Sequence, residues 1–384
     1  MIFKLFRNRL AESCKGISGF FGLNRKNKIE SADIPEKRPS EVNPPAVNRR
    51  RVLLKGLAGA PFLAGFAGIF LKDLTEPRSD SFSSASGIRD YHNQLQNLKG
   101  ELPRGRLGDL EITRLIMGCN LISGYAHARD LVYANSLFKA YHTEEKTIET
   151  FHLAEMSGIN TTFITNPNFP VFNKYLDQYS GKMQTICQTY LRANDFLGDI
   201  DKAIGNGART LYIQGGEADR YVREGNVKML GTAIEYIKKK GYMAGIGAHE
   251  LEVIKTCERE AIPVDYYVKT FHHDRYWSAH PESERVAFSV DSRRNLDHNK
   301  INDNMFDLFS SKTMEFMSEV KKPWIAFKVL AGGAIQPKDG FRFAFENGAD
   351  FICVGMFDFQ IIDDINTASE ILSGLKARTR NWYS

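Results

Sequence analysis

The chain has 384 residues, 42% of them hydrophobic and 25% charged, which is the composition of a globular protein with a large core. Its net charge of +5 comes from the N-terminal part, because residues 1–87 carry 15 Lys and Arg against 8 Asp and Glu, and residues 88–384 carry a net charge of −2. A near-neutral folded part argues against nucleic acid as a partner, and the absence of any Cys-x-x-Cys pair argues against a structural zinc site.

A leader-like segment comes first in the chain. Three arginines, Arg49 to Arg51, precede an apolar run at residues 56–71 that ends before Lys72. A basic region followed by a short apolar run is the layout of a secretory signal, and about 16 residues rich in Gly and Ala are short for a stable membrane span. We interpret residues 1–87 as a signal and linker, and residues 88–384 as the folded domain. The alternative is a core helix with basic flanks.

The basic part of this leader resembles a known export signal. Arg50 to Lys55 read Arg-Arg-Val-Leu-Leu-Lys, similar to the twin-arginine motif. The resemblance implies that the twin-arginine (Tat) machinery exports the protein already folded, with any cofactor loaded beforehand. The protein would then be periplasmic, or membrane-anchored if the leader is not cleaved, and would contact the membrane only through this segment.

Short apolar segments alternate with amphipathic ones from about residue 107 onward. Each apolar segment is rich in Ile, Val, Phe, Tyr or Leu and none contains Pro, as in buried strands. This alternation predicts a parallel sheet with crossover helices, and eight strands predict a closed (β/α)8 TIM barrel of the α/β class. No Gly-x-Gly-x-x-Gly follows a strand, which argues against a Rossmann fold. The predicted strands are Ile112–Gly118, Ile159–Thr165, Met183–Thr189, Thr210–Gln214, Met243–Ala248, Asp265–Thr270, Trp324–Leu330 and Asp350–Gly355.

The segments between the strands have the features of helices. Thr143 is a suitable N-cap for the first and Gly158 a suitable C-cap. The connection at residues 271–310 is too long for a simple turn. Because it follows a strand, we expect it on the active-site side of the barrel, as a lid or binding loop. The predicted helices are Lys146–Ser157, Val227–Lys240, Leu251–Glu260, Thr313–Lys321, Phe341–Glu346 and Ile365–Ala377.

Polar side chains occupy the predicted C-terminal ends of the strands and the loops that follow. In barrels of this type these positions build the site, so we expect a small-molecule substrate there. The positions hold Asn120, Asn166, Gln188, Tyr190, Gln214, Glu217, His249, Glu250, Lys269, His272, Lys328 and Asp358.

Two histidines in this set end neighbouring strands. His249 follows the fifth strand and His272 the sixth, so their imidazoles could approach each other across the barrel mouth. Such a pair suits acid–base catalysis near neutral pH or divalent-metal binding. A catalytic metal needs a third protein ligand, for which Gln214, Glu217 and Asp358 are the candidates. The alternative is a pair of unrelated polar residues that cap helices.

Small residues follow the last two strands. Gly332 and Gly333 come after the seventh strand, and Gly355 and Met356 end the eighth. Backbone N–H groups of such residues can face an anion, so we expect a cofactor phosphate or a carboxylate at these four residues. The alternative is that they form tight turns that the strand–loop geometry requires.

Lysines and aromatic residues near the mouth suggest further roles. Lys328 lies on the seventh strand and Lys269 on the sixth, and either could form a Schiff base if burial lowered its pKa. Phe271, Tyr276 and Trp277 begin the long loop, where they could stack on sugar rings or pack the loop down.

Parts of the chain resemble aldo-keto reductases. Leu107 to Cys119, and Ala154 to Asn160, are similar to the opening strands of that family. More closely, the chain resembles a group of exported, aldo-keto-reductase-like barrels, through His127 to Leu131, Gly245 to His249 and Phe351 to Asp358. The resemblance implies a (β/α)8 fold and, for the family proper, a nicotinamide-dependent oxidoreductase.

The residues that carry the family's reaction are not kept. The places of its catalytic Asp, Tyr, Lys and His hold Thr165-Asn166, Asn168-Phe169, Gln188 and Gln214. Without that set no proton donor for carbonyl reduction is evident, so the resemblance implies the fold and not the reaction.

Three functions therefore stay open. The first is an exported enzyme that acts on a small polar substrate, for example a carbohydrate-derived one, by acid–base or metal-assisted chemistry, as a lyase, isomerase or hydrolase. His249, His272, Gln214 and Lys328 are its candidate catalytic residues. The second is an oxidoreductase that binds NAD(P). The third is a non-catalytic barrel that binds a ligand at its mouth.

Overall fold

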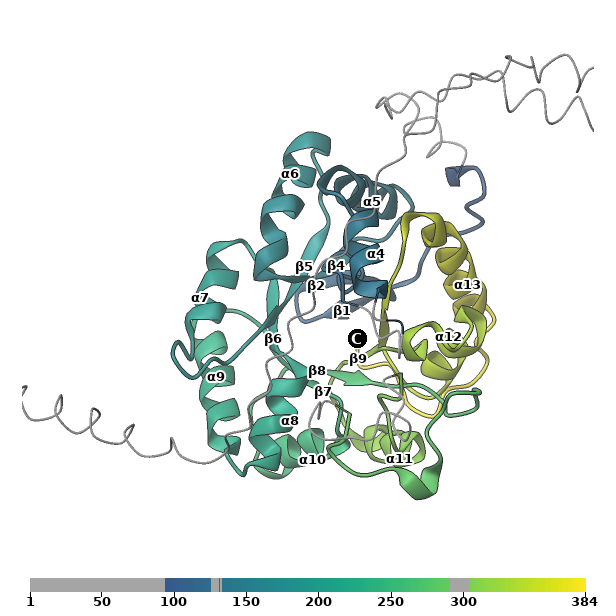
Figure 1. Cartoon of the computed structure of the whole chain (residues 1–384). Helices are drawn as coiled ribbons and strands as arrows, with labels where there is room; N and C mark the ends of the chain where they lie inside the picture. The colour runs from purple at the N-terminus through teal and green to yellow at the C-terminus, as the bar shows by residue number, and fades with distance from the viewer. Residues whose placement is uncertain (1–93, 126–130, 132, 291–303) are drawn as a thin grey trace, which may run out of the picture. The chain divides into compact units, whose positions relative to one another are not determined.

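A closed ring of parallel strands forms the centre of the molecule (Figure 1). The computed structural model describes residues 94–125, 131, 133–290 and 304–384, all within one compact unit. The eight strands follow each other around the ring in chain order, and β10 pairs with β3 to close it. This confirms the predicted (β/α)8 fold. The leader at residues 1–87 lies outside the described residues.

The barrel strands alternate between two cores. Tyr266 and Val268 of β8 pack inside the barrel, whereas Tyr267 between them packs in the outer core with the helices. The side chains of a strand point to opposite faces in turn, so the face of each site residue follows from its place in its strand. The barrel strands are β3 (Leu115–Gly118), β4 (Thr161–Thr165), β5 (Gln184–Thr189), β6 (Thr210–Ile213), β7 (Ala244–Ala248), β8 (Tyr266–Thr270), β9 (Trp324–Phe327) and β10 (Phe351–Gly355).

The first predicted strand is two strands in the structure. Its first residues belong to β2 (Leu110–Thr113), which forms an antiparallel hairpin with β1 (Arg104–Leu107), and the barrel begins with β3. Gly108 supplies the positive φ of 61° that the hairpin turn needs. Leu107 and Ile112 pack in the same cluster as the barrel interior. The hairpin therefore covers the N-terminal end of the barrel, which leaves the opposite end for a site.

Helices surround the ring (Figure 1). They are α4 (Ala134–Tyr141), α5 (Glu144–Met156), α6 (Phe169–Tyr179), α7 (Gly198–Gly205), α8 (Gly215–Arg223), α9 (Val227–Lys239), α10 (Leu251–Arg259), α11 (Ser310–Glu319), α12 (Pro337–Glu346) and α13 (Ile361–Ser373). All six predicted helices are present, although α12 and α13 begin four residues earlier than predicted, and α4, α6, α7 and α8 were not predicted. None of the described helices is both long and apolar enough to cross a membrane.

Candidate active site

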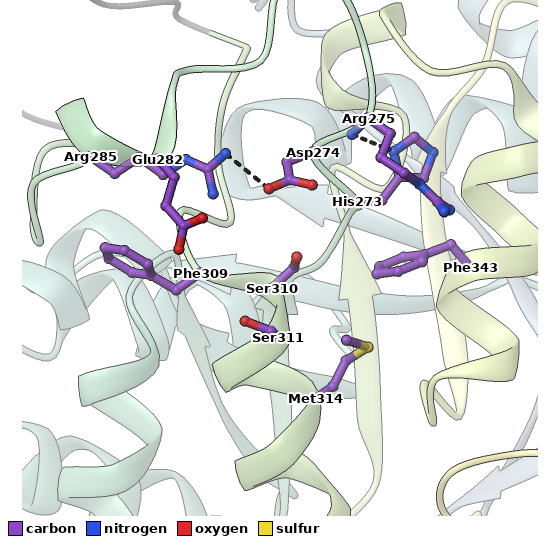
Figure 2. A pocket seen from close by; sticks show the side chains of 10 residues that line it. All are labelled: His273, Asp274, Arg275, Glu282, Arg285, Phe309, Ser310, Ser311, Met314 and Phe343. Carbon is purple, nitrogen blue, oxygen red and sulfur yellow. Dashed lines mark hydrogen bonds and ion pairs between the residues drawn. The ribbon is translucent and has the colours of Figure 1, made fainter.

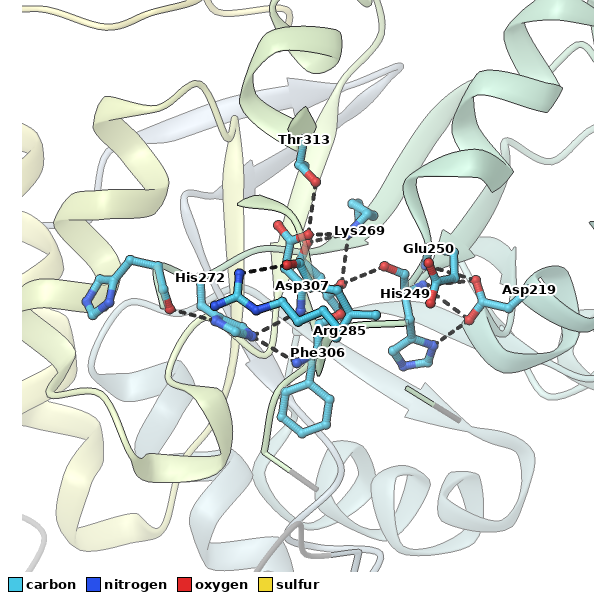
Figure 3. Close-up of polar contacts among 12 residues, drawn as sticks. Asp219, His249, Glu250, Lys269, His272, Arg285, Phe306, Asp307 and Thr313 are labelled. Carbon is cyan, nitrogen blue, oxygen red and sulfur yellow. Dashed lines mark hydrogen bonds and ion pairs between the residues drawn. The ribbon is translucent and has the colours of Figure 1, made fainter. Parts of the chain in front are cut away.

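A buried histidine and a buried aspartate meet at the C-terminal end of the barrel (Figure 3). His249 follows β7, and Asp219 lies on α8, the helix that follows β6. Oδ2 of Asp219 lies 2.8 Å from Nδ1 of His249. The same carboxylate accepts the backbone N–H groups of His249 at 3.2 Å and Glu250 at 3.1 Å. The aspartate therefore fixes both the backbone turn and the imidazole.

Two glycines make room for this arrangement. A Cβ atom on Gly215, the first residue of α8, would lie 3.1 Å from Cε1 of His249. A Cβ atom on Gly247 would lie 2.8 Å from the backbone oxygen of Ile213 and the nitrogen of Gly215. Both distances are shorter than ordinary Cβ contacts. Glycine at these positions lets α8 begin directly beside β7, which brings Asp219 within reach of His249.

Burial controls the charge of the carboxyl groups beside His249. It raises the pKa of Asp219 to about 7, although the N–H of Glu250 and the charge of Lys269 act in the opposite direction. Burial also raises the pKa of Glu250 to about 7, and the neighbouring charge of Asp219 adds to this. Oε1 of Glu250 accepts the backbone N–H of Phe288 at 2.7 Å, which ties the long loop to the mouth. The carboxyl groups of Asp219 and Glu250, beside His249, therefore titrate near neutral pH.

His272 has a different environment from His249. It is completely buried, and its Nε2 accepts the backbone N–H groups of Phe306 at 3.0 Å and Asp307 at 3.1 Å. Its Nδ1 lies 2.8 Å from the carbonyl oxygen of His273 and so carries the proton. Burial lowers the pKa of His272 to about 4. This neutral imidazole joins the two ends of the long loop, and Figure 3 shows it bonded to loop groups rather than to His249.

Lys269 points away from the barrel interior. Its Nζ lies 2.9 Å from the hydroxyl of Thr270 and 3.3 Å from Oδ1 of Asp307, and its side chain is fully buried. Asp307 also accepts the hydroxyl of Thr313 on α11 at 2.9 Å, and burial raises its pKa. This cluster fastens the end of the long loop to β8 and α11.

Lys328 lies directly after β9, with a positive φ of 56°. Its Nζ is 4.0 Å from the ring centre of Phe306 and 5.8 Å from that of Phe327. The Phe327 ring is in turn 5.6 Å from the imidazole of His249. Lys328 therefore belongs to the same part of the mouth as His249, and its charge acts to lower the pKa of Asp219.

The other candidate ligands have local partners. Oε1 of Gln214 caps α8 by accepting the N–H of Glu217 at 2.8 Å, and Glu217 pairs with Arg220 at 2.7 Å. Asp358 pairs with Lys146 at 3.1 Å and accepts the hydroxyl of Tyr141. Within the described part of the chain, no group of three His, Cys, Asp or Glu could hold a metal ion.

The glycine segment after β9 is a tight turn. Gly332 and Gly333 have positive φ values of 66° and 93°. The N–H groups of Ala331 and Gly333 donate to the carbonyl oxygens of Lys328 and Leu330, within the turn itself. Gly355, the last residue of β10, is exposed, whereas Met356 directly after it is completely buried.

Three hydrogen-bonded side chains line the inner wall near the mouth. Tyr212 of β6 donates its hydroxyl to Oε1 of Gln188 at 2.8 Å, and Nε2 of Gln188 donates to the hydroxyl oxygen of Tyr190 at 2.7 Å. Gln188 and Tyr190 stood among the polar residues expected at the strand ends. Tyr212 and Asp219 were not among the site residues predicted from the sequence. The alternation along β6 could have placed Tyr212 inside the barrel, whereas Asp219 lies on a helix that was not predicted.

A cavity of about 280 Å³ lies beside the mouth, against the long loop (Figure 2). Its walls include His273, Ser310 at the start of α11, Phe343 of α12, and the ion pair of Arg285 with Asp274 at 2.9 Å. None of the sequence-predicted catalytic residues lines it.

Comparisons with known proteins add little to the geometry. No protein-family model matches the sequence, and no curated protein matches it. Among solved structures, the chain is similar to a "putative deoxyribose-phosphate aldolase from Coccidioides immitis", with 9% identity and a TM-score of 0.36, over 74% of this chain and 98% of that one. The strand order defines the class: a (β/α)8 barrel with a buried His–Asp pair at its C-terminal end.

Proposed function

We propose that the protein is a barrel enzyme that carries out acid–base chemistry on a small polar, carbohydrate-derived substrate. His249 transfers the proton, and Asp219 positions it. The observation that carries the proposal is the 2.8 Å contact between Oδ2 of Asp219 and Nδ1 of His249, both buried, at the end of the barrel where such sites lie.

The contact defines which imidazole nitrogen does the chemistry. An ionised Asp219 accepts the proton of Nδ1, so Nε2 carries the lone pair that takes a proton from a substrate. The carboxylate also stabilises the imidazolium that forms. Because Asp219 is buried, this interaction is weakly screened by water. The pKa of Asp219, about 7, means that the Asp219–His249 pair can lose or take up a proton near neutral pH.

The other residues around His249 support this reaction without taking part in the proton transfer. Lys328 contributes positive charge beside the pair, and the contact of Glu250 with Phe288 holds the long loop at the mouth. His272 holds the long loop through the backbone of Phe306, and Gln214 caps the start of α8. The four candidate catalytic residues thus divide into one proton-transfer residue, one source of charge and two structural residues.

Hydrogen exchange at carbon tests the proposal. The full-length chain is incubated in D2O with glyceraldehyde, dihydroxyacetone, erythrose and xylulose, and deuterium incorporation next to the carbonyl group is followed by NMR. We expect incorporation with wild-type protein and its loss in His249→Asn. His272→Asn, if it folds, should keep the exchange. No incorporation above the buffer rate with any of the four sugars would reject the proposal.

An NAD(P)-dependent oxidoreductase is the alternative, which keeps the cofactor of the aldo-keto reductases but needs other catalytic residues than theirs. Titration of NADPH with the protein distinguishes it, because a bound nicotinamide changes its fluorescence. A dissociation constant in the micromolar range would favour the oxidoreductase, and an unchanged spectrum would reject it.

We also propose, from the sequence of the leader, that the twin-arginine machinery exports the protein. Arg50 and Arg51 precede the apolar run at residues 56–71. In cells, replacement of both arginines by lysine should keep the full-length chain in the cytoplasm, whereas Arg49→Lys should not. Equal export of the two variants would reject a twin-arginine route.

A further inference from the structure

The three side chains on the inner wall form a directional chain of hydrogen bonds. Tyr212 is 3% exposed and packs in the core of the barrel. Its hydroxyl donates to Oε1 of Gln188, whose Nε2 donates to the oxygen of Tyr190. Gln188 thus accepts from Tyr212 and donates to Tyr190, which follows it two residues further toward the mouth.

The last proton in this series of hydrogen bonds is the O–H proton of Tyr190. The oxygen of Tyr190 accepts from Gln188, so its own O–H must point to another group. No acceptor for it is present among the residues that the structure describes. Burial raises the pKa of Tyr190 to about 12, so the phenol keeps its proton at neutral pH. Tyr190 is therefore a neutral donor, partly exposed, just beyond the end of β5.

The three hydrogen-bonded side chains and His249 come from three consecutive strands of the barrel, because Gln188 lies on β5, Tyr212 on β6, and His249 directly after β7. Strand β6 lies between β5 and β7, and Tyr212 is in register with Gln188 on one side and Gly245 on the other. Glycine at position 245 lets the ring of Tyr266 pack against β7 beside Tyr212, because a Cβ atom there would lie 2.5 Å from that ring and 2.9 Å from Cβ of Tyr212. Tyr190 and His249 therefore approach the mouth from either side of β6.

We propose that Tyr190, oriented by Gln188 and Tyr212, binds the carbonyl oxygen of a small hydroxy-carbonyl substrate. This inference rests on the proposed function and names its substrate class. Nε2 of His249 removes a proton from the carbon next to the carbonyl group, and the electron pair of that C–H bond moves onto the carbonyl oxygen. The Tyr190 O–H stabilises the resulting oxyanion through a hydrogen bond. His249 then returns the proton to carbon, so the reaction is redox-neutral and needs no co-reactant.

Two conservative variants test this role. Tyr190→Phe removes only the hydroxyl. Gln188→Glu keeps the shape but reverses the polarity, because a carboxylate accepts from both tyrosines and turns the Tyr190 proton away from the substrate. Tyr236→Phe is the control, since Tyr236 lies on the outer helix α9 and bonds Asp201. The measurements are kcat and KM for deuterium exchange into dihydroxyacetone, and the dissociation constant of glycolohydroxamate, a mimic of the enediolate.

We expect both variants to lower kcat about 100-fold with little change in KM, as for the loss of an oxyanion donor. They should also weaken glycolohydroxamate binding about tenfold, and the control should match wild type. Exchange that His249→Asn abolishes but the two variants leave intact overturns the role of Tyr190 and keeps the proposed function. Hydroxamate binding that depends on Tyr190, without any exchange, supports the recognition and rejects the reaction. Unchanged hydroxamate binding in both variants also overturns the inference.

Discussion

Asp219 and His249 are 30 positions apart in the chain, yet Oδ2 of the first lies 2.8 Å from Nδ1 of the second, with both side chains at most 6% exposed. The contact joins the helix of one βα unit to the strand end of the next. An aspartate buried to this degree needs compensation, and three N–H groups of His249 and Glu250 provide it.

Replacement of Asp219 by Asn should remove most of the activity. An amide nitrogen at this position cannot accept the Nδ1 proton, and an imidazole that turns to its other tautomer holds a proton on Nε2. We expect kcat for sugar exchange to fall about 100-fold or more. The matched control is Glu217→Gln, another acid on the same helix, whose partner is Arg220. A kcat in Asp219→Asn within threefold of the control would contradict the role of Asp219.

The activity of the wild type should fall below neutral pH. Burial raises the pKa of Asp219 to about 7, and a proton taken up by the Asp219–His249 pair removes the free base. The pair titrates as one unit, so log kcat/KM should decline with a slope of one below about pH 7. The measurement is a pH profile of exchange between pH 5 and 9. A flat profile down to pH 5 would show that this pair is not the base.

The barrel could be predicted from the sequence, whereas this pair could not. Each predicted strand is a short, Pro-free apolar run, as in strands that are buried on both faces, and eight such runs alternating with helices predict a parallel barrel. The helix α8 is short and mostly charged or small, so its pattern gave no signal, and Asp219 was hidden in it. Its meeting with His249 depends on close packing at Gly215 and Gly247, a three-dimensional property.

The structure differs from the sequence-based prediction at two further places, and each difference has a local cause. Arg114 follows β2 and precedes β3 without a Gly or Pro to mark the break, so the apolar residues around it read as one strand. From the sequence, the imidazoles of His249 and His272 could approach each other, provided that both side chains face the mouth. The fixed backbone N–H groups of Phe306 and Asp307 instead hold the His272 imidazole within the loop.

His272 should matter for stability rather than for proton transfer. Replacement by Ala leaves the N–H groups of Phe306 and Asp307 without their acceptor and opens a cavity, so the free energy of unfolding should fall by about 3 kcal/mol or more. Chemical denaturation measures this. The comparison is His249→Ala, which should lose exchange activity with a smaller loss of stability. Equal stability of His272→Ala and wild type would contradict the structural role.

The buried pair of Lys269 and Asp307 offers a sharper stability test. Asp307→Asn removes the charge that compensates a fully buried ammonium group, which should cost about 3–5 kcal/mol. The double variant Lys269→Met with Asp307→Leu buries no charge and should recover most of that loss. Denaturation curves of the two variants and wild type give the comparison. A double variant less stable than Asp307→Asn would show that side-chain packing, and not charge, determines the contribution of this pair to stability.

Glu250 should make the protein less stable as the pH rises. Burial raises its pKa to about 7 in the folded protein, whereas a free Glu has a value near 4.3. Between these values the folded state keeps a proton that the unfolded state has lost, so the contribution of this group is present at low pH and disappears as the pH rises through about 7. Glu250→Gln removes the titration and keeps an oxygen for the N–H of Phe288. Relative to wild type, the variant should gain about 2 kcal/mol of unfolding free energy between pH 5 and pH 8.

The control for this prediction is Glu252→Gln, an exposed acid two residues further along the chain, in the first turn of α10. This variant shows how the loss of a surface carboxylate changes the free energy of unfolding over the same pH range. Denaturant titrations of wild type and both variants at pH 5, 6, 7 and 8 separate the two effects. If Glu250→Gln and wild type change in parallel across this range, then Glu250 is ionised at the lower pH. The contact between the long loop and the mouth would in that case be a carboxylate bond at all these pH values.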